Sequence, residues 1–142
     1  MYLLDTNVVS ELRKTASNKA DENVVIWAQS VAAKHLYLSA VSVMELEMGV
    51  LLVERRDVAQ GKLLRNWLTR NVLSAFDGRI LPVDTAVALK CAQLHAPDPK
   101  SERDALIAAT ALVSNMTVVT RNSPDFKYTG VQLVNPWLSI AS

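Results

Sequence analysis

Hydrophobic positions along the chain follow two alternating patterns. Short runs rich in β-branched and aromatic residues, which are typical of strands, occupy residues 1–4, 35–40, 79–83, 117–120 and 131–135. Longer stretches with apolar residues at helical spacing separate them, at residues 21–34, 42–55, 57–76, 84–96 and 101–115. Because strands that alternate with helices pair through crossover connections, this order predicts an α/β fold with a mainly parallel sheet of four to five strands.

Length and composition are those of one globular domain. The chain has 142 residues, half of them hydrophobic, and no linker or repeat divides it, so we predict a single domain over 1–142. No apolar run reaches the roughly 18 residues of a membrane span, and Asp5 interrupts what would be a signal peptide. The single cysteine, Cys91, allows no internal disulfide and has the setting of a core residue. We therefore expect a cytoplasmic protein without membrane association.

Acidic residues follow the predicted strands. Asp5 directly follows the first apolar run, and Glu45 lies about one turn into the helix after the second. Asp84 follows the third run, Asp104 begins the helix before the fourth, and Asp125 lies just beyond the fourth. Because ligands of parallel sheets bind beyond the carboxyl ends of the strands, this placement predicts a site at which carboxylates converge.

Each of these acids also has a structural interpretation. Asp5 and Asp84 stand at N-cap positions of helices. Two pairs have the serine-to-acid spacing of a capping box: Ser42 with Glu45, and Ser101 with Asp104. Taken one at a time, such acids more often cap helices than act in catalysis, and only several acids converging indicate a cation site. For Asp84 we expect the capping role alone.

Charge and motifs narrow the chemistry. Fifteen basic residues against fourteen acidic ones give a net charge of +1, which is low for a nucleic-acid binder unless a cation adds positive charge locally. His35 and His95 lack partners at zinc-ligand spacing. Glycine loops for nucleotides and the GxSxG motif of serine hydrolases are absent from the sequence. An oxygen-ligated cation such as Mg²⁺ fits the acids best.

The two central helices raise three further questions. Glu47 lies two residues from Glu45, so it points to another face, toward solvent or a partner. Gly49 shares the face of Glu45, which indicates either a close backbone approach or a merely tolerated glycine. A basic set is either a rim for RNA or a solvated face: Arg55, Lys62, Arg65 and Arg70. One stripe contains more apolar residues than a single core-facing helix needs, which suggests that part of it binds a partner: Leu63, Leu64, Trp67 and Leu68.

Four segments together resemble the PIN-domain ribonucleases, in particular the toxins of VapBC-type toxin–antitoxin pairs. They are "LLDTNVVSEL", "SAVSVMELEMG", "RDALIAATA" and "TVVTRNSPDF", in the order and spacing of that family, and "VNPWL" is similar to the tail of the same branch. The resemblance spans nearly the whole chain. It implies a three-layer α/β/α sandwich with acids gathered at one edge of the sheet.

The resemblance also implies site residues. Asp5, Glu45 and Asp104 match the three regular acids of the family's Mg²⁺ site, with Asp5 and Asp104 as metal ligands. The fourth catalytic position is shared by Asn122 and Asp125, with Asp125 as its charge. Thr6 and Asn7 match the polar pair that orients the first acid. Apart from the resemblance, Arg13 and Lys14 closely follow the first segment and are candidates to contact RNA phosphates near the site.

The implied function is a Mg²⁺-dependent endoribonuclease toxin of a type II pair, in which Mn²⁺ can substitute. It would hydrolyse RNA phosphodiester bonds, inhibit translation and growth, form a homodimer, and be neutralised in a higher assembly by a cognate antitoxin. The ligand count permits one or two metal ions. The alternative is a non-catalytic PIN-like module that binds RNA or protein. A phosphoacceptor receiver domain is disfavoured, because it needs an early acid pair and an acceptor aspartate after a central strand.

Overall fold

A five-stranded parallel sheet forms the centre of the computed structural model, which describes residues 1–138. The strands are β1 (Tyr2–Leu4), β2 (Leu36–Ser39), β3 (Ile80–Leu81), β4 (Thr117–Val119) and β5 (Leu133–Val134). Their order is β3-β2-β1-β4-β5, and every neighbouring pair is parallel. Each strand lies within a run predicted from the sequence, so the predicted parallel sheet is confirmed.

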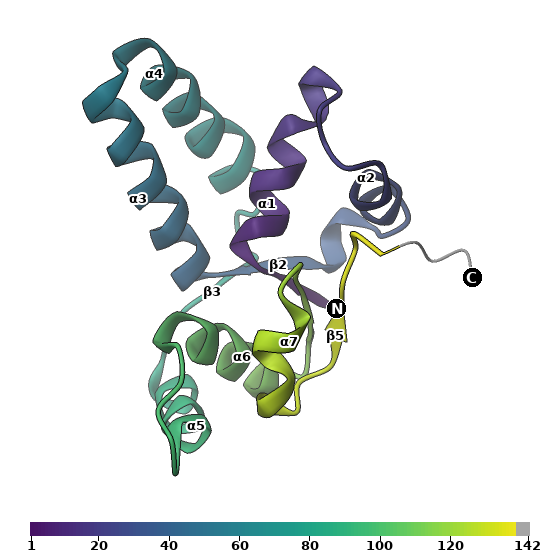
Figure 1. Cartoon of the computed structure of the whole chain (residues 1–142), viewed down its shortest axis with the longest axis vertical. Coiled ribbons are helices and arrows are strands. Elements are labelled where there is room, and N and C mark those ends of the chain that lie inside the picture. The colour runs from purple at the N-terminus through teal and green to yellow at the C-terminus, as the bar shows by residue number, and fades with distance from the viewer. Residues whose placement is uncertain (139–142) are drawn as a thin grey trace.

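Helices cover both faces of this sheet (Figure 1). One face carries α1 (Thr6–Arg13), α2 (Glu22–Gln29), α3 (Ala40–Arg56) and α4 (Val58–Asn66), which continues as a π-helical segment, Trp67–Leu73. The other face carries α5 (Thr85–His95), α6 (Glu102–Ser114) and α7 (Ser123–Phe126). Short 3₁₀ turns lie at Lys14–Ser17, Ala33–His35 and Lys127–Thr129. The molecule is the predicted α/β/α sandwich. None of its helices within residues 1–138 is both long and apolar enough to cross a membrane.

Neighbouring residues of β1 pack into opposite layers of the core. Leu4 packs with Val8 and Trp27, whereas Leu3 packs with Ile107 and Phe126. Successive side chains of a strand point to opposite faces, and both faces of a parallel sheet are covered by helices. Both residues are almost completely buried. The continuous apolar run before Asp5 therefore reflects a strand that is buried on both sides.

The helix starts agree with the sequence at some positions and differ at others. Asp84 caps α5 as predicted, since its side chain accepts a hydrogen bond from the Val87 amide at 3.0 Å. The predicted capping box of Ser42 and Glu45 is wrong. Helix α3 begins two residues before Ser42, and Ser39 is its cap, accepting from the Val41 amide at 3.0 Å. Within the described chain, Ser101 stands at the N-cap of α6 without a side-chain cap hydrogen bond.

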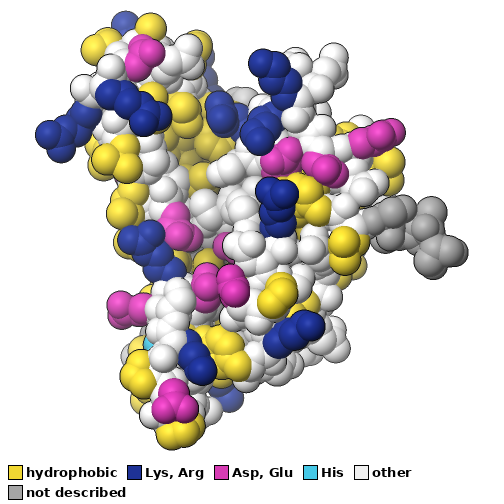
Figure 2. Space-filling view, viewed as in Figure 1, with side chains coloured by type: hydrophobic (Ala, Val, Ile, Leu, Met, Phe, Trp, Pro, Cys, Tyr) yellow, Lys and Arg dark blue, Asp and Glu magenta, His cyan; other side chains and the backbone are white. Residues whose placement is uncertain are grey.

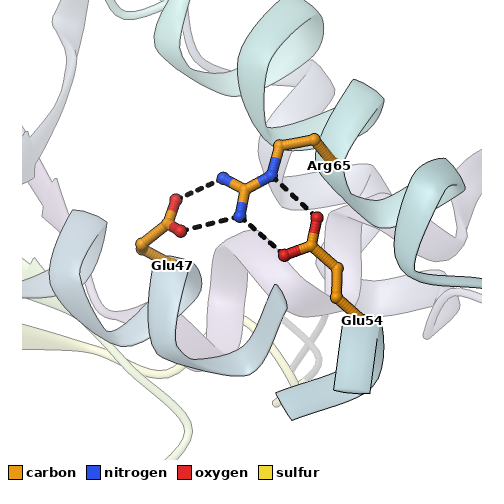
Figure 3. Close-up of polar contacts among 3 residues, drawn as sticks. All are labelled: Glu47, Glu54 and Arg65. Carbon is orange, nitrogen blue, oxygen red and sulfur yellow. Dashed lines mark hydrogen bonds and ion pairs between the residues drawn. The ribbon is translucent and has the colours of Figure 1, made fainter. Parts of the chain in front are cut away.

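Helices α3 and α4 form an antiparallel hairpin, joined by an arginine between two glutamates (Figure 3). Arg65 of α4 donates to Glu47 Oε2 at 2.8 Å and to Glu54 Oε1 at 3.0 Å, both on α3. The partner that Glu47 faces is thus the next helix of the same chain. Because Arg65 is engaged with these two acids, the predicted basic set on this hairpin does not include it as an RNA contact.

Glycine matters at the crossing of the same two helices. A Cβ on Gly61 of α4 would lie 2.6 Å from Glu54 Cα and 2.7 Å from Glu54 Cγ. At Gly49, by contrast, no heavy atom of the described chain lies within 4 Å of the corresponding position. The close backbone approach that we considered for Gly49 is therefore made by Gly61, and Gly49 is a tolerated glycine in an open position.

We expect Gly61→Ala to lower the free energy of unfolding by about 1–3 kcal/mol, because the added methyl group overlaps backbone that cannot move cheaply. Gly49→Ala is the matched control and should raise it by roughly 0.5–1 kcal/mol through helix propensity. Urea denaturation followed by circular dichroism measures both. A Gly61→Ala variant as stable as the wild type would contradict the close approach of α3 and α4.

Candidate active site

An open cavity of about 480 Å³ lies at the carboxyl edge of the sheet. Strands β1 and β4 end there side by side, and the chain runs from β1 to β2 on one side and returns to β4 on the other. This reversal of strand order is where open α/β sheets bind ligands. Four acids line the cavity: Asp5, Glu11, Glu45 and Asp104.

Asp5 is the most buried carboxylate of this cavity, with 6% of its surface exposed. It caps α1, because its Oδ1 accepts from the Thr6 amide at 2.7 Å. Its Oδ2 accepts from the Thr120 hydroxyl at 2.8 Å and from Asn7 Nδ2 at 3.4 Å. The two interpretations considered for Asp5 are therefore compatible, since the residue caps a helix and also lines the cavity.

Thr120 is a site residue that sequence reasoning missed. It is completely buried directly after β4, donates to Asp5, and accepts from the Asn122 amide at 3.0 Å. We had counted Thr120 as the last residue of the strand. The signal in the sequence was position. Thr120 is a polar residue directly after β4, just as Asp5 is a polar residue directly after β1, and the two strands pair with each other.

Glu45 is held by two contacts from other elements. Its Oε1 accepts from the Thr6 hydroxyl at 2.7 Å, and its Oε2 accepts from Arg103 Nη1 of α6 at 3.4 Å. Thr6 thus binds two acids, Asp5 through its amide and Glu45 through its hydroxyl. Arg103 was not anticipated from the sequence. Both contacts orient Glu45 toward the cavity rather than toward the start of its own helix.

The carboxylates act on one another across the cavity. Burial raises the pKa of Asp5, and the charges of Glu45 and Asp125 raise it further, against hydrogen bonds from Thr120 and Thr6 that lower it. Burial also raises the pKa of Asp104, followed by the charges of Asp5, Asp125 and Glu45. Like charges brought together disfavour the ionised state. The structure therefore gathers these four acids into one electrostatic unit.

Both candidates for the fourth position lie at the start of α7. Asn122 lines the cavity wall at the N-cap of α7. Asp125 lies in the first turn of α7, is exposed, and contributes its charge to both Asp5 and Asp104. Asn122 therefore forms part of the cavity wall, whereas Asp125 contributes negative charge that acts on Asp5 and Asp104.

The donor chemistry of the cavity fits a hard divalent cation. Within residues 1–138, no three acidic, histidine or cysteine side chains form a preformed metal cage. Mg²⁺ does not need one, because it keeps several waters and is commonly held by one or two carboxylates together with substrate phosphate. Carboxylate and water also suit Mn²⁺. A cation would in addition relieve the repulsion that raises the pKa values of Asp5 and Asp104.

Lys and Arg side chains lie among Asp and Glu side chains on the face shown in Figure 2. Arg13 and Lys14, predicted to contact RNA, both line the cavity, and Lys14 pairs with Glu11 at 3.1 Å. Arg121 also lines it and was missed by the sequence analysis. The cations that line the cavity therefore come from the end of α1 and the residue after it, and from the loop after β4.

A family model described as the PIN domain matches residues 2–130. The chain belongs to the PIN-domain family. It is 38% identical over 142 residues to Toxin FitB of Neisseria gonorrhoeae, covering 96% of this chain and 99% of that protein. It is 37% identical over 145 residues to VapC ribonuclease Y4jK of Sinorhizobium fredii, covering 96% of this chain and 98% of that protein.

Solved structures agree with this assignment. A structure of FitAB bound to an IR36 DNA fragment matches with a TM-score of 0.88 and 36% identity, covering 100% of both chains. VapBC2 of Rickettsia felis, bound to a promoter DNA fragment, matches with a TM-score of 0.69 at 24% identity, which supports the fold alone. The predicted resemblance to PIN-domain toxins of the VapBC type is confirmed.

The raised pKa values of this PIN domain link its stability to pH. A group whose pKa is raised by folding contributes stability that is present below its ordinary pKa and lost as the pH rises through the raised value. Without divalent cations, Asp104→Asn should therefore be more stable than the wild type at neutral pH, and this gain should disappear in acid below the ordinary carboxylate range. Thermal unfolding over a pH series in EDTA measures the effect.

The matched control is Asp84→Asn, which makes the same chemical change at a helix cap outside the cavity. Because asparagine caps a helix about as well as aspartate, this variant should show no such gain in stability at neutral pH. Equal pH profiles for Asp104→Asn and Asp84→Asn would show that burial and the neighbouring acids do not raise the pKa of Asp104.

Proposed function

We propose that this chain is a Mg²⁺-dependent endoribonuclease, the toxin of a type II toxin–antitoxin pair, in which Mn²⁺ can replace Mg²⁺. The observation that carries this proposal is the buried Asp5, which shares one open cavity with Glu45 and Asp104 at the switch point of the sheet and is affected by the charge of Asp125. The relatives named as FitB toxin and VapC ribonuclease support it.

Asp5 and Asp104 are the proposed metal ligands, since burial and mutual repulsion give both the most to gain from a cation. When bound, the metal supplies an acidic water and stabilises charge that develops at the phosphate. Glu45 is suited to hold the attacking water. Thr6 fixes its Oε1 at 2.7 Å, while the 3.4 Å contact of Arg103 leaves Oε2 more loosely engaged. Asn122 and Asp125, at the start of α7, complete the site.

RNA is the proposed substrate, and its phosphates would lie along the cations of the cavity wall. Arg13, Lys14 and Arg121 line the same cavity as the acids. Contacts to phosphate provide most of the sequence-independent affinity for nucleic acids. A local arrangement of this kind needs no large net charge, in accord with the overall charge of +1.

We further propose that the chain forms a homodimer and binds a cognate antitoxin, and the similarity to a chain of the FitAB complex supports the second part. Within the predicted apolar stripe, Leu68 is buried, Leu64 and Trp67 pack against the core, and Leu63 is exposed. Helix α3 adds an apolar face at helical spacing: Met44, Met48, Leu51 and Leu52. An exposed apolar surface of this kind is typical of a protein interface.

The alternative is a PIN-like module that binds RNA or protein without cleaving RNA. Such a module would have no need for Asp5 and Asp104 to be buried beside further acids, which raises the pKa of both. Calorimetric titration with Mn²⁺ separates the two functions. The nuclease should bind the ion, and Asp104→Asn should bind it much more weakly.

Asp5→Asn and Asp104→Asn should each reduce RNA cleavage at least about 100-fold, because even residues that only support metal ligands commonly contribute 10- to 100-fold. Growth arrest after induction in cells should be lost in parallel. Cleavage of RNA by the purified protein, and mapping of RNA ends after brief induction, measure both effects. The Asp84→Asn control should retain cleavage and toxicity. Full activity of Asp5→Asn, or of the wild type in excess EDTA, would refute the mechanism.

A further inference from the structure

The segment after β5 contributes an aromatic wall to the acidic cavity. Trp137, from the sequence "VNPWL", lines the cavity together with Arg121 from the loop after β4. The Arg121 guanidinium carbon lies 5.2 Å from the centre of the Trp137 ring, within the range of a cation–π contact. Trp137 is half-buried and Arg121 is exposed. The proposed metal ligands Asp5 and Asp104 line the same cavity.

A set of hydrogen bonds holds this pair in place. Asn135 Nδ2 donates to the Arg121 carbonyl at 3.2 Å, and the Trp137 amide donates to Asn135 Oδ1 at 3.0 Å. Asn23 Nδ2 of α2 donates to the Trp137 carbonyl at 2.8 Å. The Arg121 amide donates to Asn7 Oδ1 at 3.4 Å. One asparagine thus bridges the arginine and the tryptophan, and two other segments, α1 and α2, fix their positions.

The same contacts connect the pair to the proposed metal site. Asn7, which accepts from the Arg121 amide, also donates to Asp5 Oδ2 at 3.4 Å. A second arginine–tryptophan pair differs in this respect. Both tryptophans pack against the same part of the core, and Arg13 lies 5.9 Å from the Trp67 ring. Trp67, however, lines an apolar cleft, whereas Trp137 lines the acidic cavity. A contact that only anchored the tail would not require a ring in the wall of the acidic cavity.

We propose that Arg121 and Trp137 form a stacking platform for an unpaired RNA base next to the phosphate that is cleaved. The proposal rests on the nuclease function above and specifies its substrate as RNA that is single-stranded, or locally unpaired, at the cleavage site. Unpaired bases stack on aromatic rings and on arginine planes, whereas bases within a duplex are already stacked on their neighbours. Arg121 contacts two parts of the nucleotide, since its guanidinium plane stacks on the base and its positive charge attracts the phosphate.

The test compares two short fluorescein-labelled oligoribonucleotides of equal length, one with all bases and one with abasic positions. Binding is measured by fluorescence anisotropy in EDTA, where the metal-dependent reaction cannot proceed. The wild type should bind the RNA with bases at least about fivefold more tightly, as expected for one stacked base. Trp137→Leu should bind both RNAs almost equally, and Trp137→Phe should retain part of the preference. Trp67→Leu, the matched control, should behave as the wild type does.

An undiminished base preference in Trp137→Leu, or no preference in the wild type, would overturn the platform. Cleavage by the wild type with Mg²⁺ reports separately on the nuclease function, which can stand when the platform fails. If Trp137→Leu loses only its complex with a co-expressed antitoxin and keeps the base preference, the pair docks protein and the proposal is wrong. Should Trp137→Leu fail to fold, Trp137→Phe decides, because its smaller ring must lower the preference.

Discussion

The hydrogen bond between Asp5 and Thr120 joins the ends of the two central strands, and the candidate site is arranged around it. Burial of Asp5 opposes its ionisation, and the Thr120 hydroxyl and Thr6 amide offset that cost only in part. The negative charges of Glu45 and Asp125 oppose the ionisation of Asp5 further. A divalent cation would offset this repulsion for these acids together, which would give the fold a reason to hold several carboxylates at one edge of the sheet.

Local patterns predicted the elements and where they start better than they predicted contacts between them. The five strands, the helices on both faces and the cap at Asp84 follow from hydrophobic spacing and from single residues. The start of α3 did not follow from local patterns, because Ser39 and Ser42 can both cap a helix. Ser39 is the cap, and Ser42 lies within α3, where tertiary packing buries it. Thr120 was missed for the same reason, since its partner lies 115 positions away.

Charges were harder to assign than the fold. The sequence shows Arg65 within a basic set, but only the three-dimensional arrangement shows that two glutamates of α3 already engage it. Arg103 is likewise one position from Asp104 in sequence, yet it donates to Glu45, 58 positions away. With such pairs satisfied internally, the cations that remain beside the acidic cavity are few and come from the end of α1 and the loop after β4.

Glu45 also connects the acidic cavity to a neighbouring apolar cleft. This cleft, of about 250 Å³, lies between α1 and the α3–α4 hairpin and is lined by Leu46, Leu64 and Trp67. Thr6, Arg13 and Glu45 line both spaces. A partner that buried apolar side chains in the cleft would therefore touch Thr6, which orients Glu45, and Arg13, which we propose contacts RNA phosphates. Inhibition by a bound antitoxin would then require no distant conformational change, because both surfaces share these side chains.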